Sequence, residues 1–179
     1  MSERITLTGT EEERIIQALK YAGWFPGRKI DISKVEDYYK SFDLCLSAKA
    51  REFIAEYHGI KKNWYIEVTN LEWGADFQFE LFPYPKSYSI EVVDYLYDDA
   101  EYTVKSEEYE SVLNMEPHDN SLVMVGEIGY YYPARVWIGE SGIIYATHDY
   151  EDDVLVFDSI VELIKYELQN HDFLSVAMK

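Results

Sequence analysis

The sequence predicts an α+β fold in a single domain, and three observations support this class. Apolar residues recur at helical spacing over the first third of the chain. After Gly59 the pattern changes to the alternation of polar and apolar residues that is typical of strands. A Gly-Glu-Ser-Gly turn at residues 139–142 then separates two β-rich segments, which indicates an antiparallel hairpin. No internal repeat, low-complexity segment or linker interrupts the sequence, so we expect one domain over residues 1–179.

Three helices are predicted in the first third of the chain. Thr10–Glu13 fits a capping box, in which the Thr hydroxyl accepts from an amide of the first turn and the Glu carboxylate reaches back to the cap amide. Ser33–Glu36 fits a second box, and Ser47 is the predicted cap of a third helix that ends at Gly59. The residues expected to face the core are Ile15, Ile16, Leu19 and Ala22, then Val35, Tyr38, Tyr39 and Phe42, then Ala50, Phe53, Ile54 and Tyr57.

Residues 22–31, Ala-Gly-Trp-Phe-Pro-Gly-Arg-Lys-Ile-Asp, are predicted to end the first helix and to reverse the chain. Gly23 suits the position after a helix, where positive φ strains other residues, and Pro26-Gly27 suits the centre of a type II turn. We expect this stretch to be structural. Trp24 and Phe25 should pack against the core, and Arg28 and Lys29 should point into solvent.

Strands are predicted in the middle and in the last third of the chain. Residues 64–68 and 77–81 alternate between apolar and polar side chains, so each strand should have one covered face. The other β-rich segments are residues 122–128, 134–138 and 143–147.

Further helices are predicted around these strands. Residues 90–98 place Ile90, Val93, Leu96 and Tyr97 on one side of a helix, and Glu91, Asp94 and Asp98 on another. Residues 107–113 predict a short helix. Asp149–Asp153 is expected to be a charged loop, and Ser159–Glu162 a third capping box. That box opens a last helix with Ile160, Leu163, Ile164 and Leu168 inward.

The net charge of −18 is concentrated in the later part of the chain. Residues 1–62 hold 11 Lys and Arg against 10 Asp and Glu, whereas residues 63–179 hold 5 against 24. Such a field repels nucleic acid and anionic membranes and attracts a basic protein. A role in solubility alone would explain the same composition, so both interpretations stay open.

The location predicted from the sequence is the cytoplasm. The longest apolar runs are far shorter than the roughly 20 residues that span a bilayer. Met1-Ser2-Glu3-Arg4 does not lead into the apolar core of a signal peptide. Cys45 is the single cysteine and cannot form an intrachain disulfide, which agrees with a reducing compartment.

The sequence contains no motif that predicts catalysis, a cofactor or a metal. Residues 139–143 lack the final glycine of a nucleophile elbow, and nothing near Cys45 would activate its thiol. The four histidines lack the spacing of zinc ligands and are expected to be ordinary surface or partly buried residues. Asp149–Asp153 lacks the order of a calcium loop. Glycosidase chemistry requires two carboxyl groups held across a cleft, and acids that are neighbours in the sequence, such as Asp98 and Asp99, do not meet that requirement.

The 17 tyrosines are a second unusual feature of the composition. Tyrosine buries a large area, keeps a polar group and loses few rotamers, so it is frequent in protein interfaces. The alternative is that most of these rings pack along strands or under helices. The tyrosines in the acidic part include Tyr95, Tyr97, Tyr102, Tyr109, Tyr130, Tyr131 and Tyr132.

Four stretches then occur in order along the chain. Residues 22–31 follow the first helix, and Glu56-Tyr57-His58-Gly59-Ile60 ends the third. Val125-Gly126-Glu127 lies in a strand, and residues 137–145, Trp-Ile-Gly-Glu-Ser-Gly-Ile-Ile-Tyr, span the hairpin. Together these stretches resemble the SUKH superfamily and, within it, the third subgroup of immunity proteins, over about residues 11–170. The chain departs from the family's pattern at His58, where a second glycine often follows the aromatic residue.

The resemblance implies an α+β fold with helices around a mixed, mostly antiparallel sheet. It also implies a cytoplasmic role in bacterial conflict, in which the protein binds and neutralises a cognate toxin domain, often a nuclease. The charge agrees with this role, because nuclease domains are commonly basic and an acidic partner can occupy the surface that would meet phosphates. We therefore expect stoichiometric occlusion of a basic toxin domain rather than catalysis, with no cofactor or metal and no direct contact with nucleic acid or membrane.

The candidate partner-binding residues are acidic side chains of the predicted helix near residue 95 and of the charged loop. They are Glu91, Asp94, Asp98, Asp99, Glu101, Asp149, Glu151, Asp152 and Asp153. Two alternatives stay open: an adaptor or regulatory module of the same superfamily with a non-toxin partner, and a hydrolase that uses clustered carboxylates.

Overall fold

A computed structural model describes residues 4–61, 63–66, 75–82, 112, 114, 119–130, 132–168 and 173–178. The helices in this part of the chain are α1 (Glu11–Ala22), α2 (Ser33–Lys40), α3 (Ala48–Tyr57) and α6 (Ile160–Glu167). The strands are β1 (Arg4–Thr6), β2 (Asn63–Ile66), β3 (Ala75–Leu81), β4 (Val123–Tyr130), β5 (Ala134–Ile138), β6 (Ile144–His148), β7 (Glu151–Phe157) and β8 (Ser175–Met178).

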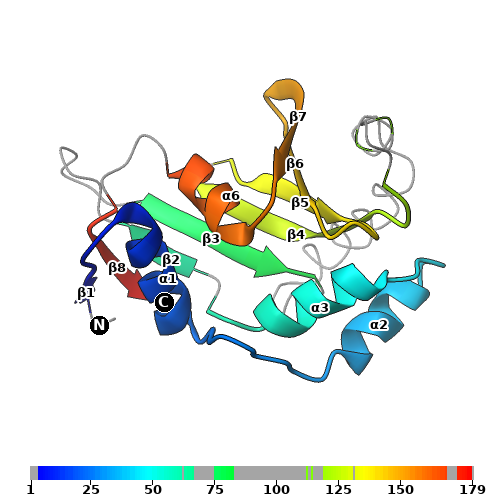
Figure 1. Cartoon of the computed structure of the whole chain (residues 1–179), viewed down its shortest axis with the longest axis horizontal. Helices are drawn as coiled ribbons and strands as arrows, with labels where there is room; N and C mark the ends of the chain where they lie inside the picture. The colour runs from blue at the N-terminus through cyan, green and yellow to red at the C-terminus, as the bar shows by residue number, and fades with distance from the viewer. Residues whose placement is uncertain are drawn as a thin grey trace, which may run out of the picture.

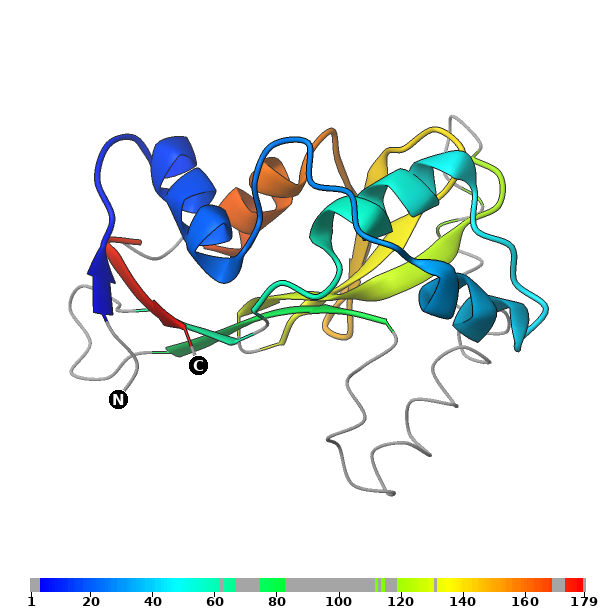
Figure 2. The same ribbon diagram turned by 90° about the horizontal axis from the view of Figure 1, so that it is seen from below.

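The strands form one sheet with helices over one of its faces. The strand order is β1-β8-β2-β3-β4-β5-β6-β7, and each pairing between described strands is antiparallel. Helices α1, α3 and α6 lie on the same side of this sheet (Figures 1 and 2). The predicted α+β class with a mostly antiparallel sheet is therefore confirmed. The extent of the domain over residues 1–179 remains a prediction.

Helix α1 begins and ends as the sequence predicts. The Thr10 hydroxyl accepts from the Glu13 amide, and the Glu13 carboxylate accepts from the Thr10 amide at 2.7 Å. At the other end Gly23 has a φ of 110°, and the Trp24 amide donates to the carbonyl of Leu19. These bonds form a Schellman motif, which satisfies carbonyls that the end of the helix would leave without partners.

The turn after α1 also forms as predicted, but only one of its two aromatic residues is buried. The Arg28 amide donates to the Phe25 carbonyl at 3.1 Å, and Gly27 has a φ of 77°, as a type II turn requires. Trp24 is buried and stacks on Tyr57 of α3 with ring planes 3° apart. Phe25 is exposed, so the prediction that it packs against the core is wrong.

Arg28 also differs from its prediction, because it does not point into solvent. Its guanidinium donates to the carbonyl of Glu56 at 2.7 Å and to that of His58 at 2.8 Å. Both carbonyls lie at the C-terminal end of α3, where orphan acceptors and the helix dipole favour a cation. Arg28 therefore ties the loop after α1 to the end of α3, whereas Lys29 is exposed as predicted.

Helix α2 is capped differently from the prediction. Its N-cap position is Ile32, which has no capping side chain, and Ser33 is the first helical residue. The Asp31 carboxylate instead accepts from the Ser33 amide at 2.9 Å, and this bond lowers the pKa of Asp31. The predicted capping box at Ser33–Glu36 is therefore wrong, although the helix and its buried residues Val35 and Tyr39 are confirmed.

The centre of the sheet carries large aromatic side chains that the strand pattern predicts. Trp64 of β2 is fully buried and stacks on Phe77 and Phe79 of β3, with ring centroids 5.2 and 5.8 Å away. Ala50 and Ile54 of α3 are fully buried as well, and the predicted cap Ser47 accepts from the Ala50 amide.

The last third of the chain forms a meander of four strands. The predicted hairpin is confirmed, since β5 pairs with β6 and residues 139–143 connect them. The predicted charged loop at Asp149–Asp153 is wrong: His148 pairs with Glu151, so only Asp149 and Tyr150 form the turn and β7 begins directly after it. Consecutive acids at the start of an edge strand explain the error, because such strands often carry charges.

Helix α6 has the predicted inward face, and half of its predicted capping box. The Ser159 hydroxyl accepts from the Glu162 amide, but the Glu162 carboxylate accepts from the amide of Asp158 instead of Ser159. The predicted helices over residues 90–98 and 107–113 lie outside the described residues, apart from Val112, which is buried.

Candidate functional site

The predicted contact residues divide between two parts of the chain. The first group, Glu91, Asp94, Asp98, Asp99 and Glu101, lies outside the described residues. The second group lies at the β6–β7 turn and at the start of β7, and consists of Asp149, Glu151, Asp152 and Asp153. Figure 1 shows β6 and β7 rising together from the end of the sheet. The second group is therefore carried by a projecting hairpin.

The three described acidic side chains of this hairpin differ in their surroundings. Asp149 pairs with Arg135 of β5 at 2.6 Å while 64% of its side chain remains exposed. Asp153 is exposed on β7. The Glu151 carboxylate lies 3.7 Å from Nδ1 of His148. Asp149 thus carries a charge that is partly compensated, whereas Asp153 presents its charge to solvent.

A buried histidine supports the base of the hairpin. The His148 side chain is fully buried, and its Nε2 lies 2.8 Å from Oε1 of Glu167 on α6, whose side chain is 5% exposed. This contact joins the end of β6 to α6. The prediction of an ordinary surface or partly buried histidine is therefore wrong for His148, because the pairing of β6 with β7 and the contact with α6 bury its ring.

Two exposed tyrosines stand beside these acids. Tyr132, between β4 and β5, is 57% exposed, and Tyr150, between β6 and β7, is 61% exposed. Their ring centroids are 6.1 Å apart with planes at 66°, and the Tyr150 ring lies 5.1 Å from that of His148. Partial desolvation and the nearby carboxylates of Glu167 and Glu151 raise the pKa of the Tyr150 hydroxyl.

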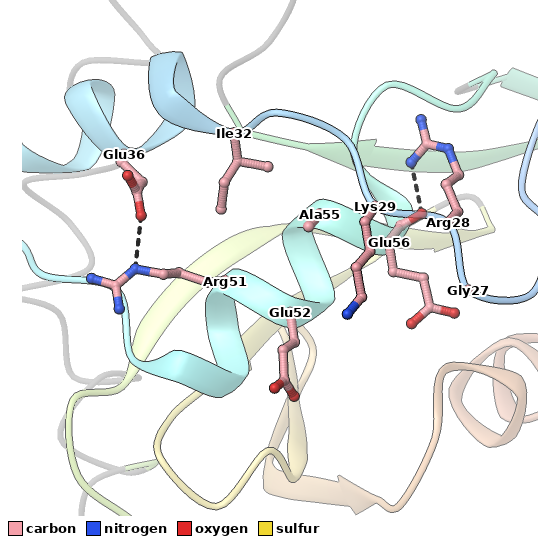
Figure 3. A pocket seen from close by; sticks show the side chains of 9 residues that line it. All are labelled: Gly27, Arg28, Lys29, Ile32, Glu36, Arg51, Glu52, Ala55 and Glu56. Atoms are coloured by element: carbon pink, nitrogen blue, oxygen red, sulfur yellow. Dashed lines mark hydrogen bonds and ion pairs between the residues drawn. The ribbon is translucent and has the colours of Figure 1, made fainter.

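A pocket of about 470 Å³ lies elsewhere, between α3, α2 and the segment that follows the type II turn. Figure 3 shows its lining side chains. They are Gly27, Arg28, Lys29, Ile32, Glu36, Arg51, Glu52, Ala55 and Glu56. The pocket therefore adjoins residues 22–31, the stretch that the sequence predicts to be structural.

Each carboxylate of the pocket has a partner. Glu36 pairs with Arg51 at 2.7 Å, and this pair is visible in Figure 3. Glu52 accepts from Lys49 at 2.8 Å, and this bond lowers the pKa of Glu52. Glu56 accepts from the indole of Trp24 at 2.9 Å. The three acids therefore stabilise the surrounding elements and do not form the converging pair that hydrolysis by carboxylates needs.

The hairpin that contains Ser141 also serves the fold. The Ser141 hydroxyl donates to the carboxylate of Asp119, and the Ser141 amide donates to the same carboxylate at 3.0 Å. Asp119 is buried, and a Cβ at Gly139 would lie 2.6 Å from it. These contacts fix the turn against the segment before β4. Among the described residues, no group of three or more His, Cys, Asp or Glu side chains is placed to hold a metal ion.

Comparison with known families identifies the class of protein. A family model for immunity proteins matches residues 11–165, which is most of the chain. That family is the SUKH-3 immunity protein family, and the chain belongs to it. Membership implies that the chain neutralises a toxin and binds a cognate toxin partner. Comparison with curated proteins and with solved structures found no significant match.

The helices of the described part of the chain fall short of the length and hydrophobicity that a membrane span requires.

Proposed function

We propose that this chain is a cytoplasmic immunity protein that inhibits a basic toxin domain, with nuclease activity, by stoichiometric occlusion. The family match over residues 11–165 carries the proposal. The proposed mechanism uses no catalysis, cofactor or metal, and it involves no direct contact with nucleic acid or membrane. The protein would cover the surface that the toxin uses to bind phosphates.

Charge supports the choice of a basic partner. The excess of acid falls entirely within residues 63–179. Asp153 and Glu151 of the β6–β7 hairpin remain at least partly exposed, and Asp149 keeps most of its side chain in solvent despite its pair with Arg135. Complementary charge accelerates encounter with a basic domain and makes the association sensitive to salt.

The proposed contact residues are those predicted from the sequence. They are Glu91, Asp94, Asp98, Asp99 and Glu101, together with Asp149, Glu151, Asp152 and Asp153. Asp149 is the weakest candidate among the described acids, because its ion pair with Arg135 already compensates part of its charge.

The experiment starts from the open reading frames beside the gene for this chain and tests any toxin domain that they encode. The domain is expressed in a bacterium with and without the chain, and growth and co-purification are measured. The proposal predicts that the chain restores growth and co-purifies with the domain. Growth arrest in the presence of the folded chain, with no complex, would reject it, and capture of only housekeeping proteins would favour the adaptor function.

Charge reversal tests the electrostatic part of the proposal. The variant Asp98→Lys/Asp99→Lys should associate more slowly with the toxin domain, and its association rate should depend less steeply on salt. The matched control is Glu12→Lys/Asp37→Lys, which makes the same change of charge at two exposed positions of α1 and α2. Equal rates for both variants would remove the first pair from the interface.

A further inference from the structure

Two tyrosines at one end of the sheet form an exposed aromatic pair. In the meander β4-β5-β6-β7, the β4–β5 and β6–β7 turns lie at the same end of the strands, which brings Tyr132 and Tyr150 together. Both rings are more than half exposed. Large aromatic side chains that remain together in solvent are typical of binding surfaces, because burial on complex formation is favourable.

Acidic residues border this pair along β7. Side chains alternate between the faces of a strand, so Glu151 and Asp153 share one face, and both residues are exposed. Glu151 also lies close enough to Tyr150 to affect its hydroxyl. The aromatic-acidic patch, defined as Tyr132, Tyr150, Glu151 and Asp153, therefore combines exposed rings with negative charge.

The patch stands on a well-anchored base. The Tyr150 ring lies over His148, which is fully buried and bonded to Glu167 of α6. The turn that carries Tyr150 has only two residues, since His148 and Glu151 already pair. A side chain held in this way loses little conformational freedom when a partner binds, which favours affinity.

The charge and the rings together select one kind of partner group. A guanidinium can stack flat on a tyrosine ring and still donate hydrogen bonds to a carboxylate at its edge. A lysine ammonium has no planar surface to stack and is more strongly hydrated. Arginine therefore fits a patch of this composition better than lysine does.

We propose that the aromatic-acidic patch is the docking site for an arginine-bearing segment of the toxin domain. This inference rests on the proposed function and assigns the binding face for it. The guanidinium lies over a ring of Tyr132 or Tyr150, and Glu151 and Asp153 accept hydrogen bonds from it or from a neighbouring basic side chain.

The first test removes the rings. Affinity of the purified chain for a catalytically inactive form of the toxin domain is measured for the wild type and for Tyr132→Ala/Tyr150→Ala. The variant should bind about tenfold to hundredfold more weakly, as expected when central aromatic contacts are lost. The matched control is Tyr21→Ala, which removes an exposed tyrosine of α1 and should bind as the wild type does. Tyr132→Phe/Tyr150→Phe keeps the rings and should retain most of the affinity.

The second test removes the charges and keeps the size of the side chains. Glu151→Gln/Asp153→Asn should slow association and flatten its salt dependence, whereas Asp37→Asn on α2 should change neither. Wild-type toxin binding by both the alanine and the amide variants would overturn the inference while leaving the proposed function intact.

The third test does not depend on the toxin. Arginine and lysine homopeptides of equal length are titrated into the wild type and into Tyr132→Ala/Tyr150→Ala. The wild type should prefer the arginine peptide, and the variant should lose that preference while its charge is unchanged. An unchanged preference in the variant would overturn the inference. Failure of the wild-type chain to bind the toxin domain would instead overturn the proposed function.

Discussion

The contact between Arg28 and α3 gives the sharpest test of how residues 22–31 act. The guanidinium bonds the carbonyls of Glu56 and His58 at 2.7 and 2.8 Å. A hydrogen bond from a charged donor contributes about 1.5–3 kcal/mol. Arg28 is only partly buried, so water replaces part of both bonds in the variant Arg28→Ala. We therefore expect the free energy of unfolding to fall by about 2–3 kcal/mol in total.

The assay is urea unfolding followed by circular dichroism, with a thermal melt as a second measurement. A change of 1 kcal/mol shifts the melting temperature of a domain of this size by about 2–4 °C, so the expected shift is about 4–12 °C. Lys29→Ala is the matched control, because it removes a neighbouring cation that is exposed, and it should change stability by less than about 0.5 kcal/mol.

A purely structural role of Arg28 also predicts that Arg28→Ala leaves the affinity for the toxin domain unchanged. At a temperature where the variant is fully folded, its affinity for the toxin domain should equal that of the wild type. Two results would refute the reasoning: an unfolding midpoint equal to that of Lys29→Ala, or a loss of toxin affinity in a fully folded variant.

Two further predictions concern the core. Ser47→Ala removes the N-cap of α3 and the hydrogen bond from Ser47 to the Gly139 carbonyl, so it should lower the free energy of unfolding in urea by about 1–2 kcal/mol. The control Ser33→Ala should lower it by less than about 0.5 kcal/mol, because Ser33 is not the cap of α2. Tyr39→Phe removes a buried hydrogen bond of 2.6 Å to the Met124 carbonyl and should cost about 1–2 kcal/mol; equal midpoints for variant and wild type would contradict this. Burial raises the pKa of Tyr39 well above its usual value, so the folded state holds the proton after the unfolded chain has released it. The contribution of the protonated Tyr39 to the free energy of unfolding is therefore complete below about pH 10 and is lost above that pH, by up to about 1.4 kcal/mol per pH unit. Tyr39→Phe should make the fall of stability with rising pH less steep in this alkaline range.

Local signals in the sequence predict the local structure well where their chemistry is self-contained. The bonds of Thr10 with Glu13 and the turn at Pro26-Gly27 depend only on residues a few positions apart. The alternation around Phe77 predicts the face of β3 that the core covers. These elements need no knowledge of distant residues.

Features that depend on distant partners are missed. Arg28 looks like a solvent-exposed cation until α3 places two carbonyls beside it. In the sequence, the acids at the start of β7 look like a charged loop. Their place on an edge strand becomes clear only from the pairing with β6, and such strands often carry charges. Strand β8 pairs with β1 from the opposite end of the chain, and no short-range pattern predicts that pairing.

The candidate site is predicted only in part. The acids Asp149, Glu151 and Asp153 are recognisable from the sequence as exposed charges. The approach of Tyr132 to Tyr150 is not, because 17 residues separate them and the meander alone brings their turns together. Burial of His148 beneath them has the same cause.

The most direct test of the proposed mechanism is a titration of toxin activity with this chain. A fixed concentration of the toxin domain, well above the dissociation constant, is mixed with increasing amounts of the chain, and residual nuclease activity is measured. Stoichiometric occlusion predicts a linear fall that reaches zero when the two proteins are equimolar. Complete inactivation by a small fraction of an equivalent would indicate catalysis by the chain, and undiminished activity at molar excess would show that it does not neutralise this toxin; either result contradicts the account.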